Sequence, residues 1–447
     1  MNEYLARSRI AKVLTDGGEE DFATAEARLA AVHLAIVIAD SELTSPAAQA
    51  CAVTALATAT RTFSKVVFVS TSNVTLARAL PGAMTLFEAA NSMGAAVCQF
   101  VPKDVTHAIF IGRGAVLPEV FVVRCWWSGW LAGLRDRWDG EDAGEGWNPL
   151  AGSFAGALAV REVFASMRGM RSLNPPACSI SLWEPWNEAG CAAASPSEVH
   201  LAREMTVVGL GHLGQGFLWN LGLLPGHGET LVLQDYQDAG AENQATGLLT
   251  SKSDVGRRKA RIAADWCEHH GWKTSLVERK FVGGTRALPD DPALVVSALD
   301  SPDPRRDLLA AGFACMLDVG VGHGPLDFEQ AQLRAFYAGD QGTWNNPEKP
   351  KNHDALLARK AYRSLHDQCG AFQLASASVA VPFVGAAVGA LVIAQALRLG
   401  AMLPTRKLLQ FEMSAPAMPS FSGMTADLNR GMGTIALNLR ERTFRNS

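Results

Sequence analysis

The segment 206–222, TVVGLGHLGQGFLWNLG, decides how the fold is interpreted. An apolar run leads into Gly209, Gly211, Gly214 and Gly216, and an apolar, helix-like stretch follows. The spacing is the dinucleotide pattern G-x-G-x-x-G with one further glycine. Backbone N–H groups and the helix N-terminus in such a turn face phosphate oxygens. The segment therefore predicts a nucleotide-binding strand–turn–helix unit. The glycines alone leave open whether the nucleotide is NAD or one that is consumed.

The composition is typical of a folded chain with more than one domain. The 447 residues exceed one ordinary core, and 48% are hydrophobic against 19% charged. A net charge of −4 gives no electrostatic basis for binding nucleic acid. The cysteines are scattered without a C-x-x-C pair, which argues against a zinc site and favours reduced thiols in a cytoplasmic protein. The charged first residues do not resemble a secretory signal.

One uncharged stretch, 370–397, is long enough to span a bilayer. It is rich in Ala, Ser and Gly, and Pro382 divides it. We expect a loop or strand followed by a buried helix of about 16 residues, and no membrane partner.

Short β-branched runs alternate with helical lengths in both halves of the chain, which predicts mostly parallel α/β sheets. The segment 171–200 contains Pro, Ser and Gly and is the expected connection between domains 1–170 and 201–447. A charged loop at 338–353 and late strands near 407–413 and 434–444 complete the second domain. No glycine-rich loop follows the first strand of the first half.

A weak internal repeat connects the two halves. The segments FAGALAVREVFA, from Phe154, and FVGAAVGALVIA, from Phe383, share five residues at identical offsets. The predicted architecture is therefore two doubly wound Rossmann-like units in tandem, the first degenerate and the second with a working nucleotide loop.

Residues beyond the glycine loop favour a nucleotide that is cleaved. Asp235 ends the next strand and can bond a ribose hydroxyl pair, which NAD and ATP share. Lys259 opens a helix after Gly256 and can stabilise the charge that builds on a leaving pyrophosphate. Asp300 lies at the carboxyl end of a buried strand, where a carboxylate can bind magnesium.

This ordered set resembles the adenylating superfamily of ThiF, MoeB and the ubiquitin-activating enzymes. The family pattern is a glycine loop, then D-x-D…N-L-x-R-Q, then G-x-x-K-A, then a strand ending in D-N/S…R. The matching positions are Asp235, Asn243, Gly256, Lys259, Ala260 and Asp300, with Arg305 or Arg306 as the following arginine. The resemblance covers roughly 201–400.

The resemblance implies ATP and Mg²⁺ as cofactors. Asp235 would bind ribose, Asn243 and Lys259 the phosphates, and Asp300 the magnesium ion. The C-terminal carboxylate of a ubiquitin-like carrier protein would attack the α-phosphate of ATP, giving an acyl-adenylate and pyrophosphate. The first half resembles the inactive adenylation-like domain that pairs with an active one in eukaryotic ubiquitin-type enzymes. A bacterial conjugation operon of the antiviral kind is the implied context.

The chain departs from the family at several positions. Gln237 replaces the second aspartate of D-x-D, and Thr246 falls on the family arginine. The zinc-binding C-x-x-C pairs are missing as well. In these enzymes an arginine can also come from the N-terminal helix of the partner domain, for which Arg7 and Arg9 are candidates. Two solvated helix charges are the alternative for Arg7 and Arg9. Arg257 and Arg258 flank the lysine.

A thioester-forming activator needs a cysteine, whose thiolate would attack the adenylate. The resemblance places Cys369 near the crossover segment, and a buried structural thiol is its alternative role. Cys267 and Cys315 are expected in the core, and His212 and His323 in loops. A thioester would be transferred to a conjugating-enzyme-like partner.

Three further functions compete with this one at the level of the sequence. Within the adenylating superfamily, an enzyme that modifies a small peptide or an RNA base is disfavoured by the second large domain, which suits a protein substrate better. The other two belong to different classes. An NAD(P)-dependent oxidoreductase would use the glycine loop and Asp235, but it leaves Lys259, Asn243 and Asp300 without a shared purpose. A non-catalytic scaffold with a relict nucleotide site would be consistent with Gln237 and Thr246. Neither the carrier protein nor the oligomeric state follows from the sequence.

Overall fold

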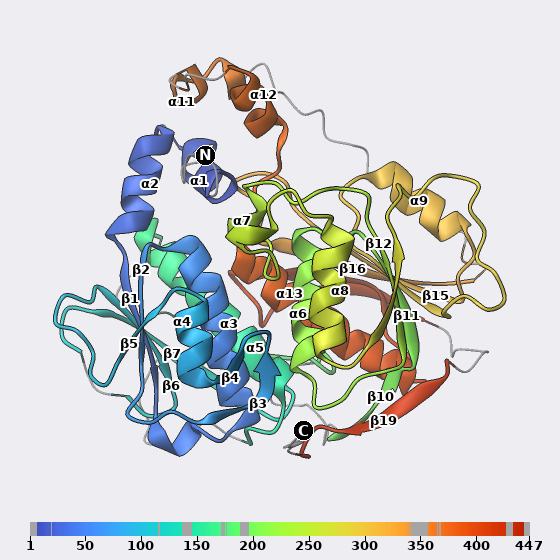
Figure 1. The fold of residues 1–447 in the computed structure, drawn as a ribbon, viewed down its shortest axis with the longest axis horizontal. Coiled ribbons are helices and arrows are strands. Elements are labelled where there is room, and N and C mark those ends of the chain that lie inside the picture. The colour runs from blue at the N-terminus through green and yellow to red at the C-terminus, as the bar shows by residue number, and fades with distance from the viewer. Residues whose placement is uncertain are drawn as a thin grey trace.

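The computed structural model describes residues 7–18, 20–114, 117–135, 145–170, 175, 177–187, 196–338, 340, 356–363, 365, 368–425 and 432–441. Within these residues the chain forms two α/β units, each built on one large sheet, that lie side by side with helices between them (Figure 1). The predicted parallel α/β architecture is therefore confirmed.

The first unit is built on a seven-stranded sheet of order β5-β2-β1-β6-β7-β8-β9. Its strands are β1 His33–Ile38, β2 Lys65–Val69, β5 Ala96–Cys98, β6 His107–Ile111, β7 Phe121–Ser128, β8 Leu131–Arg135 and β9 Cys178–Ser181, and β3 Thr75–Leu80 with β4 Ala83–Thr85 forms a hairpin. The pairs from β5 to β7 are parallel, and β8 and β9 are antiparallel. The helices are α1 Ser8–Thr15, α2 Phe22–Ala31, α3 Pro46–Thr62, α4 Leu86–Ser92 and α5 Pro149–Met167.

The second unit is built on an eight-stranded sheet of order β13-β12-β11-β14-β15-β16-β17-β18. Its strands are β11 Glu204–Val208, β12 Thr230–Gln234, β13 Lys273–Val277, β14 Leu294–Ser297, β15 Cys315–Val321, β16 Gln330–Tyr337, β17 Arg406–Glu412 and β18 Ser420–Met424, and β10 Glu198–Ala202 pairs with β19 Thr434–Asn438. The helices are α6 His212–Leu223, α7 Asn243–Thr246, α8 Lys259–His269, α9 Pro302–Ala310, α11 Lys360–Arg363, α12 Gln368–Ser376 and α13 Pro382–Gly400.

The two sheets have the same strand order and the same change from parallel to antiparallel pairing, with β18 as the one extra strand. In each unit the helix after the first strand packs against a long helix that begins with proline: α3 against α5, and α6 against α13. Because α5 also packs against α13, these helices form the shared interior of the molecule (Figure 1). The chain therefore contains a structural repeat.

The repeat differs in register from the sequence match that suggested it. In the structure Gly152 approaches the backbone of Ala47 at the start of α3, and Gly385 approaches His212 at the start of α6. Gly385 therefore corresponds to Gly152, not to Gly156 one helical turn later. The sequence alignment of the two segments depended on shared Ala and Val residues. In the structure, the equivalent positions are the glycines that contact the start of the facing helix.

The predicted connection 171–200 is partly wrong, because Cys178–Ser181 forms β9 and pairs with β8 in the first sheet. The sequence CSIS has no clear apolar alternation, so its strand depends on the neighbouring edge. The late strands are confirmed as β17 and β19. Most of the predicted loop 338–353 lies outside the described residues.

Within the part of the chain that the structure describes, two helices are long and apolar enough to cross a membrane by length and composition, α5 and α13. Every residue of α13 is buried inside the protein. The expected buried helix after Pro382 is confirmed, and a loop at 377–381 precedes it, although residues 368–376 form the short helix α12.

A buried ion-pair group also joins the units. Arg161 on α5 donates to both carboxylate oxygens of Glu329, which precedes β16, at 3.0 and 2.7 Å. It also donates to Glu162 at 2.7 Å. Because a buried ion that loses its partner strongly destabilises a fold, this group favours the observed arrangement of the two units over alternatives.

We predict that Gly389→Ala destabilises the protein by about 2 kcal/mol, because the new methyl group would overlap the backbone of Gly216. Chemical denaturation measures the effect. Gly433→Ala is the control, since the nearest atom to its new Cβ would be 3.9 Å away. Equal stability of the two variants would contradict close α6–α13 packing.

Candidate nucleotide-binding site

The glycine loop connects β11 to α6, and each of its glycines has a distinct environment. Gly209 has a φ of +89°, and a Cβ there would lie 2.7 Å from Ala298 O. A Cβ at Gly214 would overlap Gly209 O, and one at Gly216 would overlap Gly385 O. At Gly211, before the first turn of α6, a Cβ would meet no atom within 4 Å. The open space lies where a phosphate approaches in a dinucleotide loop.

Asp235 is positioned against this loop from the end of β12. Its Oδ2 accepts the N–H of Leu210 at 2.8 Å, and its Oδ1 accepts the N–H of Gln237 at 2.8 Å. Each carboxylate oxygen retains a second lone pair. Asp235, the residue predicted to bind ribose, therefore lies beside the glycine loop with its carboxylate in a fixed orientation.

Lys259 is brought to the same place by the N-terminus of α8. Its backbone N–H donates to Gln237 O at 3.0 Å, and its Nζ donates to Gln237 Oε1 at 2.7 Å. Only 7% of the residue is exposed. Burial lowers the pKa of the ammonium, while Asp235, Glu242 and Asp300 act in the opposite direction. Gln237, which replaces a family aspartate, thus holds the lysine through a neutral oxygen.

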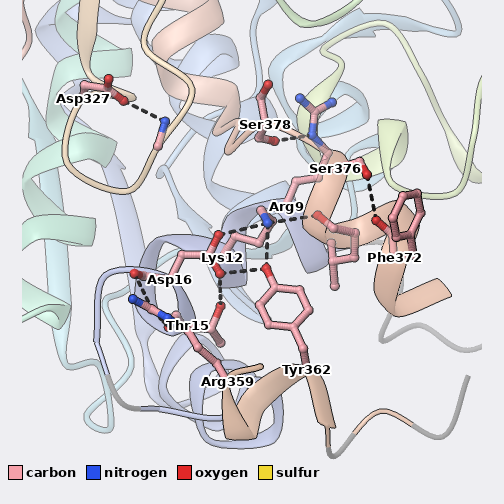
Figure 2. Close-up of polar contacts among 12 residues, drawn as sticks. Arg9, Lys12, Thr15, Asp16, Asp327, Arg359, Tyr362, Phe372, Ser376 and Ser378 are labelled. Carbon is pink, nitrogen blue, oxygen red and sulfur yellow. Dashed lines mark hydrogen bonds and ion pairs between the residues drawn. The ribbon is translucent and has the colours of Figure 1, made fainter. Parts of the chain in front are cut away.

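Arg9 extends from α1 of the first unit into the second. Its Nε donates to Ser378 O at 2.8 Å (Figure 2). Burial lowers the pKa of this guanidinium, and the negative charges of Glu242 and Asp300 act against that effect. The positive charge of Arg9 also lowers the pKa of Lys259. The structure therefore places Arg9 among the predicted site residues.

Arg7 lies elsewhere. Its guanidinium donates to Ser64 Oγ at 2.6 Å and to Phe63 O at 3.2 Å, both just after α3 in the first unit. The prediction that Arg7 joins the site is not supported by this geometry, because these bonds hold it at the end of α3. Arg7 and Arg9 diverge although they are two residues apart.

Asp300 is exposed beyond the carboxyl end of β14 and accepts a hydrogen bond from Ser301 Oγ at 3.1 Å. The arginines that follow it have their own partners. Arg305 lies 3.3 Å from Asp318 and donates to Leu299 O, next to Asp300. Arg306 pairs with Asp303 at the surface. These contacts account for both arginines without a nucleotide.

Asn243 begins α7, and its Oδ1 accepts the N–H of Gly240 at 2.9 Å. Thr246, at the family arginine position, is fully buried and donates to Glu242 O at 3.1 Å, so it presents no substitute charge. Sequence reasoning missed Glu242, whose charge acts on both Arg9 and Lys259. The available signal was an acidic residue directly before the matched asparagine.

The arginines that flank Lys259 form ion pairs near the protein surface. Arg257 pairs with Asp254 at 2.5 Å and Asp265 at 2.7 Å. Arg258 lies 3.3 Å from Asp238. Both arginines that flank Lys259 therefore already have carboxylate partners.

The corresponding turn of the first unit lies between β1 and α3. It contains the short 3-10 helix Asp40–Glu42 and has no glycine pattern. Glu42 is 6% exposed, and its side chain lies so close to Gly112 that a Cβ added there would overlap Glu42 Cγ. A carboxylate buried in this turn would repel a phosphate, so the loop of the first unit is unsuited to a nucleotide.

Helices α11 and α12 pack against α1 at one end of the site (Figures 1 and 2). Lys12, only 2% exposed, donates to Tyr362 Oη at 2.6 Å and Leu374 O at 2.9 Å, and pairs with Asp16 at 2.9 Å. Tyr362 donates to Asp16 Oδ1 at 2.7 Å. Cys369 lies on α12, but its side chain is outside the described part of the chain.

The structure agrees with the expected positions of Cys267, Cys315 and His323 but not with that of His212. Cys267 and Cys315 are buried core residues as predicted, and burial raises the pKa of the Cys315 thiol to about 12. His323 lies in a loop, with its Nδ1 2.9 Å from Ser378 Oγ. His212 is not a loop residue: it begins α6, and its Nε2 lies 2.7 Å from Val381 O. Burial lowers the pKa of His212 to about 4, so it is neutral at pH 7.

The metal ligand that the sequence predicts is Asp300. Among the residues that the structure describes, no group of three or more His, Cys, Asp or Glu side chains could hold a metal ion. Asp300 is a single exposed carboxylate. That arrangement fits magnesium only if phosphate oxygens and water supply the other ligands, as is usual for this ion.

Taken together, a parallel α/β sheet, a glycine loop open at Gly211 and an acidic residue at the end of the next strand define a Rossmann-type nucleotide-binding protein. Residues 33–182 match the family model described as the BilD N-terminal domain, and residues 201–401 match that of the BilD C-terminal domain. The chain is thus similar to this family in both of its units.

One relative is named "Bacterial E1-like protein BilD", from Collimonas sp. (strain OK412). It is 32% identical over 288 residues, which make up 62% of this chain and 62% of the relative. The chain therefore spans less than two thirds of the length of this curated relative. A crystal structure of E. coli MccB with MccA-N7isoASN is 12% identical, covering 51% of this chain and 65% of that one. Its TM-score is 0.35, a similarity too slight to add to the argument.

We predict that Lys12→Met loosens α11 and α12, because Asp16 and Tyr362 would lose the buried ammonium between them. Removing one member of a buried ion pair destabilises by about 3 kcal/mol. Hydrogen exchange of the amides in 360–376 measures the local effect. Lys65→Met, at an exposed position on β2, is the control. Unchanged exchange in the Lys12 variant would show that the contact is dispensable.

Proposed function

We propose that the chain is an ATP-dependent adenylating enzyme that activates the C-terminal carboxylate of a ubiquitin-like protein. The observation that carries the proposal is that Asp235 bonds the glycine loop and Lys259 bonds Gln237, two residues after Asp235. Arg9, contributed by the other unit, shares with Lys259 the electrostatic influence of Glu242 and Asp300. The E1-like name of the relative supports the same class of reaction.

In the proposed reaction, a carboxylate oxygen of the carrier attacks the α-phosphate of ATP. The bond to the bridging oxygen breaks, and pyrophosphate leaves with negative charge. The loop amides near Gly211 would bind phosphate oxygens, and Asp235 would accept a ribose hydroxyl. Lys259 and Arg9 would neutralise the leaving charge from fixed positions, so catalysis is electrostatic and positional.

Asn243 has a separate part in this scheme. Its Oδ1 already accepts the N–H of Gly240, so its amide nitrogen is the group that would donate to a phosphate. Asp300 would hold a magnesium ion, which would supply charge neutralisation for the phosphates. The negative charge of Glu242 raises the pKa of Arg9 and of Lys259, and the phosphates of a bound nucleotide would act in the same direction.

A thioester step is a further part of the proposal. The Cys369 thiolate would attack the carbonyl carbon of the acyl-adenylate, and AMP would leave as the carbon–oxygen bond breaks. The burial of Cys267 and Cys315 in the core argues against either of them as the thioester cysteine. A conjugating-enzyme-like partner would accept the carrier from this thioester.

The first test is ATP–pyrophosphate exchange with purified protein and candidate ubiquitin-like carriers. We expect carrier-dependent exchange that falls about a hundredfold or more in Lys259→Ala and Asp300→Ala, because both remove charge stabilisation of the leaving group. Lys252→Ala, an exposed lysine of the same region, is the matched control and keeps wild-type exchange. Exchange at wild-type level in Lys259→Ala would contradict the assigned site. No exchange with any carrier, together with tight NADH binding, would return the glycine loop to a dehydrogenase.

The second test concerns Cys369. After incubation with ATP and carrier, a non-reducing gel should show a carrier–enzyme band that thiol reagents remove. Cys369→Ala should lose the band and keep pyrophosphate exchange, because adenylation precedes thioester formation. Cys98→Ala, which changes a half-buried thiol on β5, should keep both. A band that survives in Cys369→Ala would exclude this cysteine.

A further inference from the structure

Arg61 crosses from the first unit to the second near the nucleotide loop. It lies in the last turn of α3, and its guanidinium ends on backbone carbonyls beyond α7. Nε donates to Gly247 O at 3.1 Å, and Nη2 donates to Leu248 O at 2.9 Å and Thr250 O at 3.4 Å. Among the described residues, no carboxylate pairs with Arg61. Burial lowers the pKa of this guanidinium to about 10, so it is still charged at pH 7.

The carbonyls that Arg61 binds belong to a segment that also contacts the glycine loop. Gln215, on α6, accepts the N–H of Leu249 at 2.9 Å through Oε1. The same side chain donates from Nε2 to Leu210 O at 3.1 Å, within the glycine loop. The segment 247–250 is therefore held between Arg61 on one side and Gln215 on the other. It directly follows α7, which begins with Asn243.

The chemistry of the contact requires an arginine. Three carbonyls that follow a short helix need several donors in a fixed arrangement, and the planar guanidinium provides them from one side chain. A lysine would keep the charge but could not span the same oxygens from a single nitrogen. The position is also notable because Thr246, the residue before this segment, stands where the related pattern has an arginine.

We propose that Arg61 is a positioning residue through which the first unit holds segment 247–250, and with it Asn243 and the glycine loop, in the geometry that binds the nucleotide. The inference rests on the proposed function for the identity of the nucleotide as ATP. It assigns to the unit without a glycine loop a direct part in shaping the site of the other unit.

Arg78 supplies a matched control. It also comes from the first unit, donates to backbone carbonyls of the second, and is half-buried: its Nε donates to Gly222 O at 3.2 Å and its Nη2 to His270 O at 3.3 Å. Gly222 lies near the end of α6 opposite the glycine loop. Removing Arg78 therefore breaks a similar contact between the units at a place remote from the nucleotide.

The experiment compares full-length wild type, Arg61→Met, Arg61→Lys and Arg78→Met. Hydrogen exchange of the nucleotide-free chain should show faster exchange across 243–250 in both Arg61 variants, and wild-type exchange there in Arg78→Met. Titration calorimetry with Mg²⁺ and ATP should show affinity about tenfold weaker in the Arg61 variants, as expected for lost charge-assisted hydrogen bonds, and within about twofold of wild type in Arg78→Met. Arg61→Lys keeps the positive charge, and it is the variant that tests the proposal if Arg61→Met does not fold.

Wild-type exchange across 243–250 in Arg61→Lys and Arg61→Met would overturn the inference, as would equal losses of ATP affinity in the Arg61 and Arg78 variants. A wild-type chain that binds no ATP would overturn the proposed function instead. In that case the exchange measurement still decides whether Arg61 holds the segment, because it uses no nucleotide.

Discussion

The close backbone contact between α6 and α13 is the constraint on which the rest of the structure depends. Gly216 and Gly389 each approach the other helix so closely that no Cβ fits. Helix α6 starts directly after the glycine loop, so its position fixes the direction of the loop amides. Because α13 also packs against α5, the same contact sets where the first unit lies relative to the loop. Small residues on one helix pair therefore align both units with the nucleotide site.

The interface between the units combines apolar packing with buried and partly buried cations. Arg61 and Arg78 cross from the first unit and end on carbonyl oxygens, whereas Arg161 binds the carboxylate of Glu329. Arg9 extends into the second unit beside the site. Buried guanidinium groups require specific partners, because an unpaired buried charge is strongly unfavourable. The relative placement of the units is thus specified by polar geometry as well as by shape, and the site depends on both.

The sequence predicted the features that follow from local rules. The glycine spacing, Asp235 after its strand and Lys259 at a helix start each depend on a few neighbouring residues, and the structure brings them together. Three features depended on distant parts of the chain and were missed. Strand β9 forms because it pairs with the edge of β8. Glu242 acts on the site because Arg9 extends there from the other unit. Arg7 points away from the site because it donates hydrogen bonds to Phe63 and Ser64. The register of the repeat also required the backbone contact to be seen.

The shared topology has a consequence for how the two units can change. In a symmetric pair of identical chains, every substitution occurs twice, so a carboxylate placed in the phosphate turn would disable both sites together. Here the two units lie in one polypeptide, and each position is independent of its counterpart. Glu42 can therefore fill the turn of the first unit while Gly211 keeps that of the second open. Covalent linkage allows the two halves to specialise, one as the site and the other as its support.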